Sequence, residues 1–96
     1  MAAWMIGAIK HVTDPAEFAE YQRLAEPWVA EYGGKFIAGG NKIEVADGSW
    51  SLDRVVVLEF ENLEQAKKFY YSPEYQAVIG RRFKSTDSSA VFVEGG

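Results

Sequence analysis

RVVVLEF, residues 54–60, is the most apolar run in this chain of 96 residues. Its valines and phenylalanine favour extended backbone, so we interpret Leu52–Glu61 as a β-strand. A strand with so few polar positions is typical of the interior of a sheet. This stretch is therefore predicted to be a central strand.

The sequence before this run predicts a partner strand. Lys35–Val45 has a strand-like composition, and Asp47-Gly48 after it is a strong signal for a two-residue hairpin turn. Gly39-Gly40-Asn41 interrupts the strand and predicts a bulge or a change in the direction of the chain. We expect the two strands to form a long antiparallel hairpin.

The sequence after the run is helical. Apolar spacing predicts a helical region over Leu63–Phe83, with Asn62 as N-cap and Gln65 completing a capping box. Ser72-Pro73-Glu74 is a second helix start, so this region is expected to form two segments. A strand at Ala90–Glu94 follows.

The first third of the chain repeats the strand–helix pattern. Trp4–Val12 is strand-like, and Asp14–Tyr32 has the three- and four-residue apolar spacing of an amphipathic helix. Asp14 is interpreted as an N-cap and Pro15 as the first helical residue. Pro27 lies deep inside the helix and predicts a kink or a break.

The order of elements is therefore β-α-β-β-α-β. It predicts an α+β, ferredoxin-like sandwich, with an antiparallel sheet and both helices on one face. The other face would expose an apolar surface that a soluble monomer seldom tolerates. The partner that we expect to cover it is a second copy of this chain, in a homodimer.

Composition excludes several classes of protein. The net charge is −4, which argues against nucleic acid or an anionic membrane as a partner, and the basic cluster Arg81, Arg82 and Lys84 is too small to reverse that. The absence of cysteine excludes disulfides, thiolate nucleophiles, zinc ribbons and iron–sulfur clusters. One histidine without metal-ligand spacing predicts neither a metal site nor a bound cofactor.

The chain also lacks targeting signals. Met1–Ile9 is apolar but lacks the basic n-region and the long apolar h-region of a signal peptide. No apolar run approaches the ~20 residues needed to cross a bilayer. We expect a soluble, cytoplasmic protein. No Gly-x-Ser-x-Gly motif surrounds Ser72, which argues against a serine hydrolase.

Two ionisable side chains at strand ends are the candidate catalytic residues. His11, the only histidine, ends the first predicted strand, where an imidazole suits acid–base work at the mouth of a pocket. Glu59 ends the most apolar strand, where loss of solvent would favour a general base. The structural alternatives are a surface histidine near the helix cap and a strand-end ion pair of Glu59 with Lys10 or Arg54.

Four further side chains are candidate ligand-binding residues. Arg54, which opens the central strand, would anchor an anionic group. Tyr21, Trp50 and Tyr75 would supply stacking surfaces and hydroxyl donors for a partly apolar ligand. Aromatic residues are also common in cores and dimer interfaces, and that interpretation stays open.

Several segments together carry a family resemblance. They are Trp4, Val12-Thr13-Asp14-Pro15, Tyr21, Tyr32-Gly33-Gly34-Lys35-Phe36, Gly39-Gly40, Glu44, Gly48, Arg54-Val55-Val56-Val57, Glu59-Phe60 and Tyr70-Tyr71-Ser72-Pro73-Glu74-Tyr75-Gln76. Over nearly its whole length the chain resembles the DUF1330 family of small bacterial proteins. We therefore expect residues 1–96 to form a single domain of that type.

The resemblance implies a ferredoxin-like fold within the dimeric α/β-barrel superfamily, in which two sheets press together around an enclosed space. Some members of that superfamily are cofactor-independent monooxygenases, isomerases, decarboxylases or haem-degrading enzymes. DUF1330 is itself a domain of unknown function, so it supplies no catalytic residue. Two classes of function stay open: a binding protein or cofactor-independent enzyme for a small, partly apolar or carboxylated metabolite, and a non-catalytic structural or accessory dimer.

Overall fold

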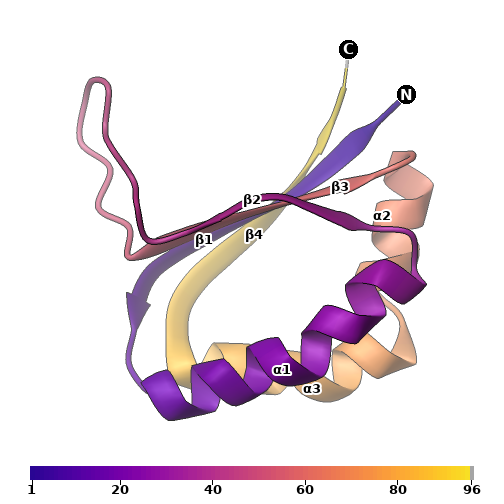
Figure 1. Ribbon diagram of the computed structural model, residues 1–96, viewed down its shortest axis with the longest axis horizontal. Coiled ribbons are helices and arrows are strands. Elements are labelled where there is room, and N and C mark those ends of the chain that lie inside the picture. Colours follow the sequence, from indigo (N-terminus) through magenta and orange to yellow (C-terminus); the bar gives the residue numbers. More distant parts are fainter. Residues whose placement is uncertain (96) are drawn as a thin grey trace.

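The computed structural model describes residues 1–95, so Gly96, the last residue of the predicted domain, lies outside the described part. Helices and strands follow one another in the predicted order, and the second helical region forms two helices, as predicted (Figure 1). The elements are β1 (Ala3–Val12), α1 (Pro15–Glu31), β2 (Lys35–Gly40), β3 (Arg54–Phe60), α2 (Leu63–Tyr70), α3 (Pro73–Ser85) and β4 (Thr86–Glu94).

The strands form one four-stranded sheet in the order β2-β3-β1-β4, and every neighbouring pair is antiparallel. Helices α1 and α3 lie side by side below the sheet (Figure 1). This is the ferredoxin-like α+β architecture that the element order predicts. β3 lies between β2 and β1, so the prediction of a central strand for the most apolar run is confirmed.

The helix starts follow the predicted caps. Side-chain oxygens of Asp14, Asn62 and Ser72 each accept the backbone N–H three residues later, at 2.8–3.1 Å. Gln65 departs from the predicted capping box, because its Nε2 donates to the carbonyl oxygen of Tyr32 at 2.6 Å and so ties the start of α2 to the end of α1. α1 continues through Pro27, so the predicted alternative of a broken helix is wrong.

The β2–β3 connection differs from the prediction. β2 ends at Gly40, whose φ of +136° turns the chain out of the sheet, and residues 41–53 contain no strand. The register shift that marks a bulge falls between Phe36 and Ala38 instead of at the paired glycines. Residues 41–53 therefore form a long loop, which rises on the side of the sheet away from α1 and α3 (Figure 1).

The last strand is longer than predicted. β4 begins at Thr86, directly after α3, whereas apolar composition indicated a start at Ala90. Thr86, Asp87, Ser88 and Ser89 are polar, but they pair with the end of β1, across a register shift between Ile9 and His11. An edge strand tolerates such residues because one side of it has no neighbouring strand.

The core lies between the sheet and the helices. Met5, Leu58 and Phe60 point from the sheet toward the helices, and they pack against Phe69 of α2 and Tyr75 of α3. Phe60, Phe69 and Tyr75 are each no more than 1% exposed. The period of two along β1 and β3 thus directs one set of side chains into the core and the alternate set to the other face.

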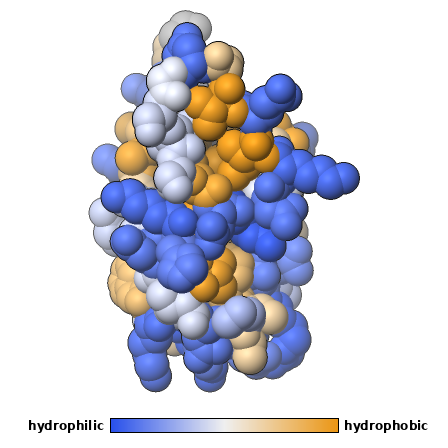
Figure 2. All heavy atoms as spheres, turned by 90° about the vertical axis from the view of Figure 1, so that its left-hand side faces the viewer, coloured by the Kyte–Doolittle hydropathy of each residue, from blue (hydrophilic) through white to orange (hydrophobic). Residues whose placement is uncertain are grey.

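That other face, which we call the bare face, is apolar. In its centre Ile6 lies between Val57 of β3 and Val91 of β4 in register. Val91 is 52% exposed and Val93 is 42% exposed. Figure 2 shows hydrophobic side chains in the upper half of the molecule, on the side of the sheet away from α1 and α3. None of the helices formed by residues 1–95 is both long and apolar enough to span a membrane.

The junction between α1 and β2 is tightly packed at Gly34. A Cβ at this position would lie 2.7 Å from Phe60 Cε1 and 2.9 Å from Val29 Cγ1, and both side chains are buried. We expect Gly34→Ala to lower the free energy of unfolding by about 1–3 kcal/mol, the usual cost of overpacking a core. Urea denaturation measures this loss.

The matched control is Gly80→Ala on the exposed surface of α3, where a Cβ meets nothing within 4 Å. It should stabilise the protein by roughly 0.5–1 kcal/mol through helix propensity. Equal effects of the two substitutions would contradict the packing argument.

Candidate functional site

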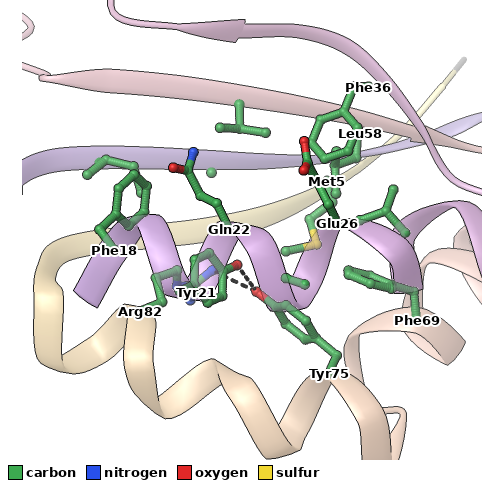
Figure 3. Close-up of a pocket in the computed structure, with 15 residues that line it drawn as sticks. Met5, Phe18, Tyr21, Gln22, Glu26, Phe36, Leu58, Phe69, Tyr75 and Arg82 are labelled. Carbon is green, nitrogen blue, oxygen red and sulfur yellow. Dashed lines mark hydrogen bonds between the residues drawn. The ribbon is translucent and has the colours of Figure 1, made fainter. Parts of the chain in front are cut away.

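A cavity of about 90 Å³ lies between the helix-facing side of the sheet and α1 (Figure 3). Its walls are mostly apolar side chains from β1, β3 and α1, closed at one end by Phe69 of α2. Gly7 of β1 forms part of the wall on the sheet side, because the absence of a side chain there leaves space between the sheet and α1. The composition of the cavity, apolar walls with a few polar groups, resembles that of small-molecule sites.

Two tyrosines supply polar groups at the side of the cavity toward α3. Tyr21 of α1 and Tyr75 of α3 point toward each other, and their hydroxyl oxygens are 2.6 Å apart (Figure 3). Burial raises the pKa of both hydroxyls, and the neighbouring Tyr21 raises the pKa of Tyr75 further. Both phenols therefore stay protonated at neutral pH and act as hydrogen-bond donors.

Arg82 of α3 completes this polar cluster. It is 5% exposed, and its Nη1 lies 3.4 Å from the Tyr75 hydroxyl. Within residues 1–95 its Nε has no hydrogen-bond partner, and no carboxylate forms a salt bridge with it. A buried guanidinium that lacks an acidic partner is costly, since its loss of hydration is not compensated.

The mouth of the cavity carries a different set of side chains. Gln22 and Glu26 extend from α1 toward the sheet, and Phe36 of β2 lies opposite Glu26 (Figure 3). Phe36 is 53% exposed, so the cavity opens to solvent on this side. Among the described residues that line the cavity, Glu26 is the carboxylate.

Two of the predicted ligand-binding residues line this cavity: Tyr21 and Tyr75. Arg54 does not line it, and its guanidinium lies 5.6 Å from the ring centre of Phe18, which does. Trp50 lies in the loop of residues 41–53 and is 59% exposed. The structure thus brings together the two tyrosines and separates them from the other two candidates.

The predicted catalytic pair lies elsewhere. His11 Nδ1 is 3.2 Å from Asp53 Oδ2, and the histidine side chain is 68% exposed. Glu59 is on the bare face, where Trp4 Nε1 donates to its Oε2 at 3.1 Å. Glu59 pairs with Trp4, which lies seven residues before His11 on β1. At about 3.3 Å per residue, Glu59 and His11 are therefore about 23 Å apart along the strand. They do not form one site.

Arg82 is the residue that sequence reasoning missed. The sequence presents it as one of a basic cluster, too small to indicate nucleic acid or an anionic membrane as a partner. Its neighbour Arg81 forms an ion pair with Glu17 at 2.7 Å. The available signal was spacing, because Arg82 follows Tyr75 by seven residues and so shares its face of a helix. Metal binding has no support in residues 1–95, where no three acidic or histidine side chains gather.

Solved structures with this fold are similar over almost the whole chain. A protein of unknown function from Rhodopseudomonas palustris has a TM-score of 0.79 at 16% identity, over 99% of this chain and 82% of its own. A dimeric ferredoxin-like protein of unknown function from a Jannaschia species has a TM-score of 0.79 at 12% identity, over 99% and 100%. SnoaB, a cofactor-independent oxygenase from Streptomyces nogalater, has a TM-score of 0.63 at 12% identity, over 99% and 91%.

At such low identity these likenesses show the fold alone. Comparison with the curated proteins gives no match. Comparison with protein families does: the DUF1330 model, described as a domain of unknown function, matches residues 2–96. The resemblance seen in the sequence is thereby confirmed, and the chain belongs to the DUF1330 family.

Proposed function

We propose that this protein is a homodimer that binds a small, mostly apolar molecule in the cavity between the sheet and α1 of each subunit. The observation that carries the proposal is the Tyr21–Tyr75 hydroxyl pair beside an apolar cavity of about 90 Å³. Buried hydroxyls placed next to open apolar space are suited to orient a ligand that has one polar end.

The size of the cavity limits the ligand. An engineered apolar cavity of about 150 Å³ holds one benzene ring, so a cavity of about 90 Å³ holds less than a whole ring without movement of α1. A short branched metabolite has this size. A monocyclic aromatic or larger ligand would extend through the mouth past Gln22 and Glu26.

The bare face supports the dimeric state. Ile6, Val57 and Val91 form an apolar row across three strands, and monomeric proteins seldom expose such a surface. The Jannaschia relative is described as dimeric. In this arrangement Glu59 and Trp4, which share the bare face, would contribute to the interface instead of to the ligand site.

Any reaction at this site would use the cavity's own side chains. One of the two tyrosine hydroxyls donates to the other, and the hydroxyl with the free hydrogen would donate to an oxygen of the ligand. Glu26 at the mouth has the chemistry of a general base. The cofactor-independent oxygenase among the similar folds supports this class of reaction only by analogy. Binding is therefore the proposed function, and catalysis depends on the identity of the ligand.

Filling the cavity tests the proposal. A Cβ at Gly7 would lie 3.9 Å from Val56 Cβ, which is ordinary contact, so a side chain can be added at this position. Gly7 lines the cavity, so we expect the methyl groups of a valine to enter the space that a ligand would occupy. With toluene as the probe, we expect chemical-shift changes in the lining residues of the wild type by two-dimensional NMR. Gly7→Val should weaken toluene binding at least about tenfold while leaving stability unchanged or raised, since glycine weakens a strand.

Gly80→Val is the control, because it adds the same side chain where nothing lies within 4 Å. Toluene should bind this variant as it binds the wild type. A dimeric wild type that binds neither toluene nor a co-purified molecule, as judged by native mass spectrometry, would instead support the alternative of an accessory dimer.

A further inference from the structure

The buried guanidinium of Arg82 has no acidic partner among residues 1–95. At 5% exposure Arg82 is among the most buried polar residues. Its guanidinium donates to the Tyr75 hydroxyl at 3.4 Å and lies 5.1 Å from the ring centre of Phe83, and neither contact neutralises its charge. Its neighbour Arg81 shows the ordinary solution for an arginine on α3, a surface ion pair with Glu17. A lysine- or arginine-type charge is seldom kept inside a protein without an acidic partner.

The free nitrogen of Arg82 is well placed for an incoming ligand. Arg82 lines the cavity, and its Nε has no hydrogen-bond partner within residues 1–95. In Figure 3 the guanidinium lies beside the Tyr21 and Tyr75 hydroxyls. One phenolic hydrogen is used between the two tyrosines, so the guanidinium and one hydroxyl remain as donors in an otherwise apolar space. The Nε–Nη edge of a guanidinium matches the two oxygens of a carboxylate.

We infer that the ligand of this cavity is a carboxylate with an apolar body, and that Arg82 is its anion anchor, assisted by the hydroxyls of Tyr21 and Tyr75. The inference rests on the proposed function and adds the chemical class of the ligand. It also transfers the anchor role from Arg54, whose guanidinium lies against Phe18, to Arg82.

The two tyrosines also favour a carboxylate as the ligand. Burial holds both phenols in the protonated form, so they offer hydrogens and add no negative charge to repel an anion. Glu26, the carboxylate that lines the cavity, is exposed at the mouth. The side of the cavity at Arg82, Tyr21 and Tyr75 is therefore positively charged and offers hydrogen-bond donors, whereas the mouth carries the negative charge of Glu26.

A matched pair of probes tests the inference. Benzoate and benzamide have nearly the same shape and size, so both would extend to the same degree through the mouth of the cavity, but only benzoate is charged. We expect benzoate to bind the wild type at least ~10-fold more tightly, as is usual for a charge-assisted hydrogen bond. Isothermal titration calorimetry gives both dissociation constants.

Arg82→Met removes the charge and keeps much of the side-chain volume. It should weaken benzoate binding at least ~10-fold and leave benzamide binding within about threefold, because the amide does not depend on the cation. The thermal midpoint of the unliganded variant should stay the same or rise, since an unpaired buried charge is removed. Arg81→Met, the same change on the surface of the same helix, should affect neither probe.

The outcomes separate the inference from the proposed function. If both probes bind the wild type equally, the cavity is a ligand site but the carboxylate assignment is wrong. If neither binds, and toluene does not bind either, the proposed function fails as well. The wild-type comparison does not depend on any variant, so a failure of Arg82→Met to fold would still leave the inference open to contradiction.

Discussion

Ile6→Asp is expected to convert the proposed dimer into monomers at micromolar concentration. Ile6 lies at the centre of the bare face, with Val57 and Val91 on either side. In a two-fold dimer the substitution brings two carboxylates into an apolar interface, at a cost of several kcal/mol per ion. A loss of ~3 kcal/mol already weakens association about 100-fold. Sedimentation velocity measures the change.

The unassociated subunit should keep its fold, because residue 6 faces away from the core and an exposed aspartate is solvated. Circular dichroism of the variant should match that of the wild type. Ala77→Asp, at an exposed position on α3, adds the same charge on the opposite side of the molecule and should leave the dimer intact. A wild type that sediments as a monomer, or an Ile6→Asp variant that stays dimeric, would overturn the assignment of this face.

Phe69→Ala is expected to lower the free energy of unfolding by about 3–5 kcal/mol. Phe69 is 1% exposed, and its ring centre lies 4.6 Å from that of Tyr75 and 5.6 Å from that of Phe60. It therefore joins α2 to both α3 and the sheet. The loss would be a large fraction of the stability of an ordinary domain of this size, which is about 5–15 kcal/mol.

Urea denaturation at one fixed protein concentration measures this loss, since a dimer's apparent stability depends on concentration. Tyr71→Ala is the control: Tyr71 lies just after α2, and it is 65% exposed. Its truncation should cost less than about 1 kcal/mol. A Phe69→Ala loss no larger than the Tyr71→Ala loss would show that the aromatic cluster is not the main support of the core.

Element order was readable from the sequence because each helix and strand carries a local signal. Asp14-Pro15 and Ser72-Pro73 place helix starts through side-chain oxygens that reach backbone N–H groups three residues away. The run of residues 54–60 is apolar because it is an interior strand. These signals depend on neighbours in the chain and need no knowledge of the fold.

The positions where strands begin and end were predicted less accurately, because they depend on hydrogen bonding to a neighbouring strand. Residues 43–45 look like a strand, yet Gly40 directs the chain away from β3, and no partner is available for them. Residues 86–89 look like a loop, yet β1 extends far enough to pair with them. In both cases the deciding fact is the position of another strand, which composition does not encode.

The candidate site shows the same division. Aromatic character marked Tyr21 and Tyr75 as ligand-binding candidates, and both line the cavity. Charge and position at strand ends marked His11, Glu59 and Arg54 as candidates. In the fold His11 lies at an exposed strand end and Glu59 lies on the bare face. The guanidinium of Arg54 lies over the ring of Phe18. Arg82 had the same charge as its neighbours in the sequence, and only its direction on α3 distinguishes it.

The sequence by itself determined the ferredoxin-like order of elements and the existence of an apolar sheet face, because these follow from periodicity and local caps. The family followed from a resemblance of its motifs, which the match over residues 2–96 confirms. Only the tertiary structure decided which residues share the cavity. Tyr21 and Tyr75 are far apart in the chain, and their hydroxyls meet at 2.6 Å because α1 and α3 pack side by side. A site built across two helices and a sheet depends on packing, and packing is a property of the whole fold.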